Sequence, residues 1–105
     1  MQVPTAFVHQ AQFSRAVARA AQRLAPDVVS KIPTLRNDWS GEPAVFFMVI
    51  LSDAASLRDR ILTTSNRVQQ VLNDEVQLLE QWGVLPYFNF RSQSEQARLD
   101  QLAVA

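Results

Sequence analysis

An uninterrupted apolar run of eight residues, Ala44–Leu51, lies near the middle of the chain and has the sequence Ala-Val-Phe-Phe-Met-Val-Ile-Leu. It is rich in β-branched and aromatic residues and has turn formers on both sides, which predicts a strand. Because side chains alternate between the two faces of a strand, a run without polar positions predicts cover on both faces. We therefore expect this run to be the centre of a sheet, so that Phe47→Asp or Val49→Asp would prevent folding.

Two further segments predict neighbouring strands. Residues 28–36 contain β-branched residues and also Pro33, which lacks a backbone donor, so we expect an edge strand there. The segment 37–43 is dense in turn formers and would join that strand to the central one as a hairpin. Residues 86–91 alternate in polarity and predict a short third strand with its phenylalanines directed inward.

Three segments predict helices. Residues 5–24 contain no Gly or Pro and place apolar residues at three- and four-residue steps. A longer helical pattern covers 54–82, and Gly83 follows it as a left-handed C-cap. Its polar face continues through the middle of the segment, so we expect one uninterrupted helix. Residues 93–102 begin with the spacing of a capping box and predict a short terminal helix.

These elements predict a single α+β domain over residues 1–105, in the order α-β-β-α-β with a final short helix. A right-handed crossover makes the second and third strands parallel, so we expect a three-stranded mixed sheet ordered 1-2-3 packed against the long helix. A helix over 54–82 would be about 43 Å long, against about 26 Å for an eight-residue strand. This overhang favours self-association, and a second sheet face left bare by the helices would likewise need a partner.

The residue inventory excludes most catalytic and metal-binding chemistry. The chain has no Cys, one His and two Gly. Without cysteine it has no thiolate nucleophile and no Cys-ligated zinc, and two glycines are too few for a Gly-rich phosphate loop. The carboxylates are scattered, with no D-x-D pair to hold a catalytic metal ion. We therefore expect no enzymatic activity, no metal and no cofactor.

The charges sum to zero, with ten Lys+Arg and ten Asp+Glu. A neutral total argues against strong nucleic-acid binding. Residues 1–36 hold five of the cations and one anion, whereas 37–105 hold five cations and nine anions. This separation would suit the packing of two copies. The longest apolar run is too short for a membrane span of about 20 residues, and no signal-peptide pattern is present, so we expect a cytoplasmic protein without a membrane partner.

The predicted order of elements resembles that of RNA-binding KH-like domains. The resemblance covers topology only, because the G-x-x-G loop of those domains is absent and the two glycines, Gly41 and Gly83, lie far apart. The aromatic residues of 86–91 together with Arg91 have the chemistry to stack on bases. A strand that is half core and half surface explains the same pattern, and we do not expect a nucleic-acid partner.

One candidate site lies at the carboxyl ends of the two parallel strands. The predicted topology places Asp53 near Arg91, Ser92 and Glu95, and open sheets bind ligands at this end. The same residues are the types that cap helices and form surface ion pairs. They are therefore either a ligand or partner site or only structural groups.

Two other features are candidates for an interface. Arg15, Arg19 and Arg23 recur at four-residue steps on one side of the first predicted helix. Trp39 lies in the predicted hairpin turn, where an aromatic side chain either folds back onto the sheet or is presented as an interface anchor. The arginine stripe is either a solvated face or a docking surface.

The sequence therefore predicts a small, non-catalytic cytoplasmic interaction or assembly module that forms a homodimer or binds another protein. A regulatory partner such as an antitoxin-like protein is a second hypothesis, which co-purification with a specific protein would reveal. A third is a small-ligand or nucleotide-binding domain that uses the end of the sheet with Asp53 and Arg91. A thermal-shift screen against phosphorylated metabolites would reveal that class.

Overall fold

The apolar run is the central strand of a three-stranded mixed sheet ordered β1-β2-β3, as predicted. The structure, a computed structural model, describes residues 3–104. Strand β2 (Pro43–Leu51) pairs antiparallel with β1 (Val28–Asn37) and parallel with β3 (Leu85–Ser92). The strand that contains Pro33 is an edge strand, because a proline has no N–H to donate to a second neighbour. The α+β class is confirmed.

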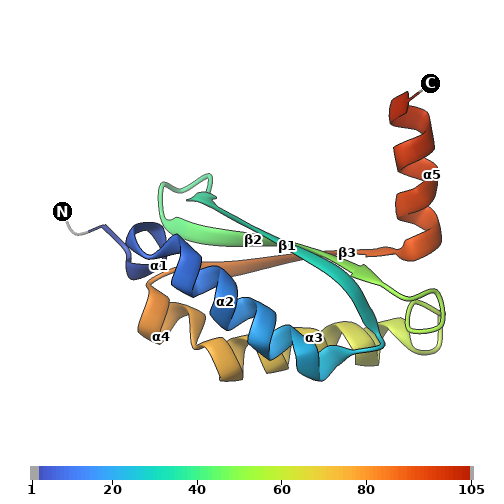
Figure 1. The fold of residues 1–105 in the computed structure, drawn as a ribbon, viewed down its shortest axis with the longest axis horizontal. Helices are drawn as coiled ribbons and strands as arrows, with labels where there is room; N and C mark the ends of the chain where they lie inside the picture. The colour runs from blue at the N-terminus through green and yellow to red at the C-terminus, as the bar shows by residue number, and fades with distance from the viewer. Residues whose placement is uncertain (1–2, 105) are drawn as a thin grey trace.

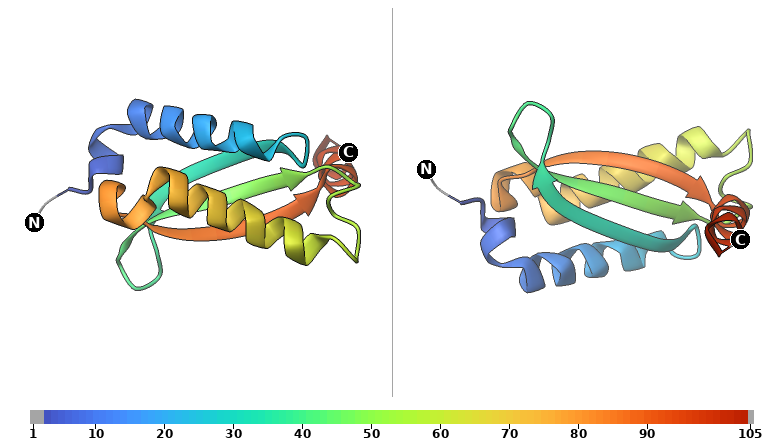
Figure 2. Two further views of the ribbon diagram at one scale, coloured as in Figure 1. Left: turned by 90° about the horizontal axis from the view of Figure 1, so that it is seen from below. Right: turned by 90° about the horizontal axis from the view of Figure 1, so that it is seen from above.

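Helices lie on both sides of the sheet but in very different numbers (Figure 1). Four of them and a 3-10 turn lie on one face: α1 (Thr5–Val8), α2 (Gln10–Ala21), η1 (Gln22–Leu24), α3 (Ile61–Val76) and α4 (Leu78–Trp82). Helix α5 (Gln93–Val104) follows β3 and rises from the end of the sheet on the opposite side. Figure 2 shows α2 and α3 running along the same face of the sheet.

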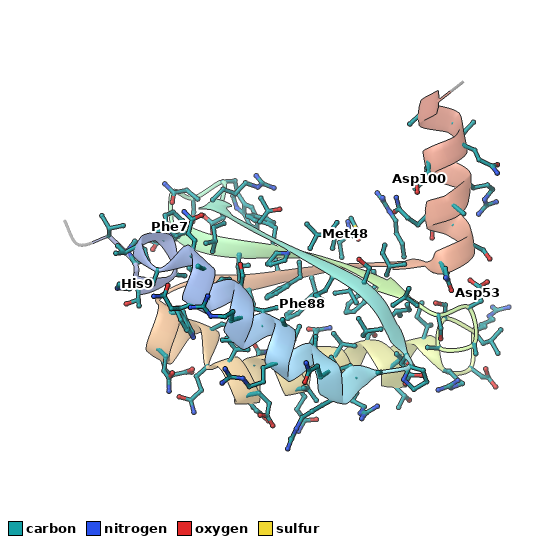
Figure 3. All side chains as sticks on the ribbon, in the orientation of Figure 1. Phe7, His9, Met48, Asp53, Phe88 and Asp100 are labelled. Carbon is teal, nitrogen blue, oxygen red and sulfur yellow. The ribbon has the colours of Figure 1, made fainter. Side chains whose placement is uncertain are left out.

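The core lies between the sheet and this helix layer. Strand β2 buries four alternating side chains on that face: Val45, Phe47, Val49 and Leu51. The helices contribute the predicted apolar stripes, of which the fully buried members are Phe13, Val17, Leu24, Val68, Leu72 and Leu78. From β3, Phe88 stacks on Phe47 with ring centres 5.1 Å apart, so its inward direction is confirmed (Figure 3).

The prediction of one helix over 54–82 is wrong. Residues 53–60 form turns, because serine side chains bind the local backbone and compete with helix formation. The Ser52 hydroxyl accepts a hydrogen bond from the Ala55 N–H at 3.1 Å, and the Ser56 hydroxyl donates to the Ser52 carbonyl at 2.8 Å. At 16 residues, α3 is about 24 Å long, so it does not overhang the sheet and gives no support for self-association.

A second break separates α3 from α4. Gln77 takes the left-handed conformation (φ 57°), which turns the chain and brings Leu78 into the core. The predicted left-handed cap is confirmed at Gly83 (φ 70°), where the Val84 N–H donates back to the Leu78 carbonyl at 3.1 Å. The predicted N-terminal helix is likewise divided, at His9, into α1 and α2. Both breaks fold short end pieces over the core.

The second face of the sheet lacks a helix layer, contrary to the cover on both faces that the apolar run predicts. We call this the open face. The register places on it alternate residues of each strand: Ser30, Ile32, Thr34 and Arg36 of β1, Phe46, Met48 and Ile50 of β2, and Tyr87, Asn89 and Arg91 of β3. Figure 3 shows Met48 on this face and Phe88 on the other. All four helices that precede β3 are used on the core face.

The two phenylalanines at the centre of β2 test this division. Phe47 is buried in the core, whereas its neighbour Phe46 is half-buried on the open face. Phe47→Ala should lower the free energy of unfolding by about 3–5 kcal/mol because it leaves a cavity. Phe46→Ala should cost less than half as much, since its site is already open to water. Urea denaturation at a dilution where each chain folds alone measures both, and equal losses would contradict the assigned faces.

Candidate functional site: the open face of the sheet

The open face carries two adjoining hollows. One, of about 400 Å³, lies toward the β1–β2 hairpin and is lined by Thr34, Arg36, Phe46 and Tyr87 among others. The other, of about 440 Å³, lies toward α5. Met48 lines both, so the two hollows adjoin along the sheet, and we call them together the trough. A solvent-facing sheet surface usually carries polar side chains, and this one is largely apolar at its centre.

Aromatic side chains form the hairpin end of the trough. The rings of Phe46 and Tyr87 stack with centres 4.9 Å apart. The guanidinium of Arg36 lies 3.8 Å from the centre of the Phe46 ring, which is a cation–π contact. Trp39 lies against Tyr87, with ring centres 5.3 Å apart, yet 83% of its surface is exposed. Trp39 therefore both touches the sheet and presents its indole to solvent.

Asp38 fixes the conformation of this hairpin. Its carboxylate accepts hydrogen bonds from the Ser40 N–H (2.9 Å), the Ser40 hydroxyl (2.7 Å), the Glu42 N–H (3.0 Å) and the Tyr87 hydroxyl (2.8 Å). These bonds, the Ser40 hydroxyl first, lower the pKa of Asp38 to about 2. The bond to Asp38 raises the pKa of Tyr87. Neither Asp38 nor Tyr87 was among the predicted site residues, although an Asp two positions before a Ser is a signal for such a turn.

The four residues predicted at the carboxyl ends of β2 and β3 are brought together, and they hold the base of α5. The Asp53 carboxylate accepts hydrogen bonds from the Ser94 N–H, at 3.0 Å, and from the Ser94 hydroxyl. These bonds lower the pKa of Asp53. The Ser92 hydroxyl caps the helix by accepting from the Glu95 N–H at 3.1 Å. The structure thus gives Asp53 and Ser92 capping roles, and Glu95 contributes its backbone N–H.

Arg91 begins a chain of side chains that rises along α5. It donates to the Gln96 side-chain carbonyl at 3.0 Å, and the Gln96 amide donates to the Asp100 carboxylate at 2.8 Å. Gln96 and Asp100 both line the hollow at this end, together with Gln93 and Ala97. Figure 3 shows Asp100 on α5, well above the sheet. The inner side of α5 is therefore a polar wall of the trough.

The remaining interface candidates lie elsewhere. Arg23 forms an ion pair with Glu75 of α3, and its carbonyl accepts a hydrogen bond from Arg67 at 3.1 Å. Arg15 and Arg19 are exposed on α2, in the helix layer. The structure therefore does not bring the arginine stripe near Trp39, which lies at the trough on the other side of the sheet.

Residues 3–104 contain no cluster of metal ligands, no unpaired buried side-chain polar atom and no helix that could cross a membrane. No three or more His, Asp or Glu side chains among them are grouped so that they could hold a metal ion. Every buried side-chain nitrogen and oxygen in this range has a hydrogen-bond partner. No helix in the described part is both long and apolar enough to cross a membrane.

The chain has no match among protein-family models, curated proteins or solved structures. The fold itself defines the class: a small single-domain α+β protein with a three-stranded mixed sheet and one helix layer. The open face of the sheet is therefore the candidate functional site.

The lowered pKa of Asp38 makes stability depend on pH in a defined window. A carboxyl whose pKa is lower in the folded state stabilises the fold above its ordinary value of 3.8, and this contribution is lost as the pH falls toward about 2. Asp38→Asn should therefore flatten the dependence of Tm on pH between about 4 and about 2. Thermal melts followed by circular dichroism measure this. Asp74→Asn, at an exposed position of α3, is the matched control, and equal slopes for both variants and wild type would contradict the role of Asp38.

Proposed function

We propose that this protein is a non-catalytic interaction module that self-associates through the open face of its sheet. The observation that carries the proposal is the apolar centre of a face that no helix covers. Ile32 is 56% exposed there, and Phe46 and Met48 are only half-buried. Exposed apolar patches that are rimmed by polar groups mark interaction sites on globular proteins.

The composition of this face supports a protein partner rather than a small anionic ligand or a nucleic acid. Its centre is apolar and aromatic, which is typical of the middle of a protein interface. Its charged groups lie at the two ends, with Arg36 near the hairpin and Arg91 and Asp100 near α5. A second copy of the chain supplies a face of the same size and polarity, as a two-fold interface requires.

A charge at the centre of the trough tests this proposal. Met48→Asp should convert a dimer into a monomer, because burying a carboxylate among apolar side chains is costly. Light scattering coupled to size exclusion, over a dilution series, measures the mass. Ile32→Asp should act in the same way, and its exposure on an edge strand makes it the variant less liable to unfold.

The matched control is Leu62→Asp, which places the same charge at an exposed leucine of α3 in the helix layer. It should leave the dimer intact. A wild-type chain that is a monomer at every concentration, or open-face variants that dimerise like wild type, would overturn the proposal. Circular dichroism confirms that each variant is folded.

The arginine stripe provides a second discriminating test. If the open face carries the association, Arg15→Glu combined with Arg19→Glu should leave the mass unchanged, because both side chains lie in the helix layer. If the stripe docks onto an acidic surface, the same double variant should weaken association, and the loss should depend on salt. Light scattering at low and high ionic strength separates the two.

A further inference from the structure

We propose that the two copies pack open face to open face with their ends reversed, so that Asp100 of each copy pairs with Arg36 of the other. This inference rests on the proposed function and adds the orientation of the second copy and the role of α5. In this arrangement α5 contacts the β1–β2 hairpin of the second copy and does not cover its own sheet. Three observations support it: the charges at the two ends of the open face, the height of α5 above the sheet and the area of the face.

Two simple two-fold arrangements bring a pair of open faces together. An axis along the strands places β1 over β3 of the second copy and sets the two α5 helices side by side. An axis across the strands keeps β1 over β1 and reverses the ends, so that α5 of one copy stands at the hairpin of the other. The structure discriminates between them by what lies at each end of the trough (Figure 1).

Arg36 and Asp100 carry opposite charges at opposite ends of the trough, and Arg91 also lines the α5 end. Arg36 lines the hollow at the hairpin end, rests on the Phe46 ring, and is absent from the ion pairs formed within residues 3–104. Asp100 lines the hollow at the α5 end, where its carboxylate accepts a bond from the neutral Gln96 amide. The Asp38 carboxylate, in the same hairpin, already accepts four hydrogen bonds.

Reversing the ends therefore places an unpaired cation against a carboxylate, twice by symmetry. The alternative axis brings the two Asp100 carboxylates to the same end, and it places Arg36 opposite Leu85 of the second copy, the β3 residue of its row, with no carboxylate to pair with. Since like charges facing each other across an interface are unfavourable, the reversed arrangement is the complementary one. Both contacts lie at the rim of the apolar centre, where charged pairs set orientation more than affinity.

The height of α5 fits this arrangement. Asp100 lies six residues beyond Ser94, so it stands about 9 Å further along the helix axis. Sheets that pack face to face are about 10 Å apart. Figure 1 shows that α5 rises from the end of the sheet on the open side. In the proposed dimer the Asp100 carboxylate would therefore lie at the level of the second sheet. A carboxylate one turn earlier on α5 would lie about 5 Å lower and would not reach Arg36 of the second copy.

The area of the sheet also requires the hairpin and α5. Three strands at about 4.8 Å spacing and about 30 Å length present roughly 400 Å². A stable interface usually buries about 800 Å² on each partner. The remaining surface must come from the two ends of the trough, where Trp39 is 83% exposed and Leu102 of α5 is 70% exposed. Contact between α5 and the partner's hairpin supplies that surface.

A charge exchange tests the pairing. Arg36→Asp and Asp100→Arg, each alone, should weaken dimerisation about tenfold, because each places two like charges together at both contacts. The double variant carries the same two charges in exchanged positions and should return to within about threefold of wild type. Sedimentation equilibrium measures the dimer Kd. The matched control is Glu95→Arg, the same change of charge on α5 at a residue that does not line the trough.

The outcomes separate this inference from the proposed function. Single variants that dimerise like wild type, while Met48→Asp still gives a monomer, overturn the Arg36–Asp100 pairing and leave the open face as the interface. A double variant no better than the singles also overturns the pairing. A wild-type monomer overturns the proposed function itself.

The absence of native cysteine allows an independent test of orientation. With the ends reversed, Ile32 lies opposite Ile32 of the second copy, so Ile32→Cys alone should form a cross-linked dimer on treatment with a short bismaleimide. With the other axis, Ile32 faces Asn89 of the second copy, because these residues flank Met48 in one row. A cross-link that forms only when Ile32→Cys and Asn89→Cys copies are mixed would overturn the proposal.

Discussion

Strand β2 presents apolar side chains to both faces of the sheet, and within residues 3–104 a helix layer covers only one of them. On the helix side, Val45, Phe47, Val49 and Leu51 form the floor of the core. On the other side, Phe46 and Met48 are only half-buried. Because the hydrophobic effect scales with the apolar area removed from water, this uncovered half is where association gains the most free energy.

Two carboxylates organise the ends of the uncovered face. Asp38 holds the hairpin against Tyr87 through its four hydrogen bonds, so that the aromatic end of the trough is pre-ordered. Asp53 holds the first turn of α5 through Ser94, so that the helix stands at a fixed position at the other end. Groups that are ordered before binding lose less conformational entropy when a partner docks. The same residues that cap local structure therefore shape the interaction surface.

The sequence predicted the sheet well because its signals are local or follow from general rules. The apolar run, Pro33 and the turn formers determined the central strand, the edge strand and the hairpin, and the handedness of crossovers determined the parallel pairing. The long helix was wrong because its apolar periodicity continues through Gln77, where a left-handed backbone interrupts it. Tertiary packing of Leu78 selects that break, and a periodic pattern contains no signal for it.

The candidate site was predicted only in part, for a similar reason. The pairing rules brought Asp53, Arg91, Ser92 and Glu95 together, but their capping contacts with Ser94 and Gln96 depend on side-chain geometry. The bond from Tyr87 to Asp38 joins residues 49 positions apart, so no local pattern reveals it. Cover on both faces of β2 was expected from polarity alone. Strand β2 is apolar on both faces, but within residues 3–104 no helix layer covers the second face.

The emission spectrum of Trp39 tests the central claim most directly. In a Trp82→Phe background it is the single tryptophan of the chain, and in one copy its indole is 83% exposed beside the trough. If two copies pack open face to open face, its emission should shift to shorter wavelength as the concentration rises through the dimer Kd. Emission that stays at the wavelength of an exposed indole in a solution that light scattering shows to be dimeric would contradict the account.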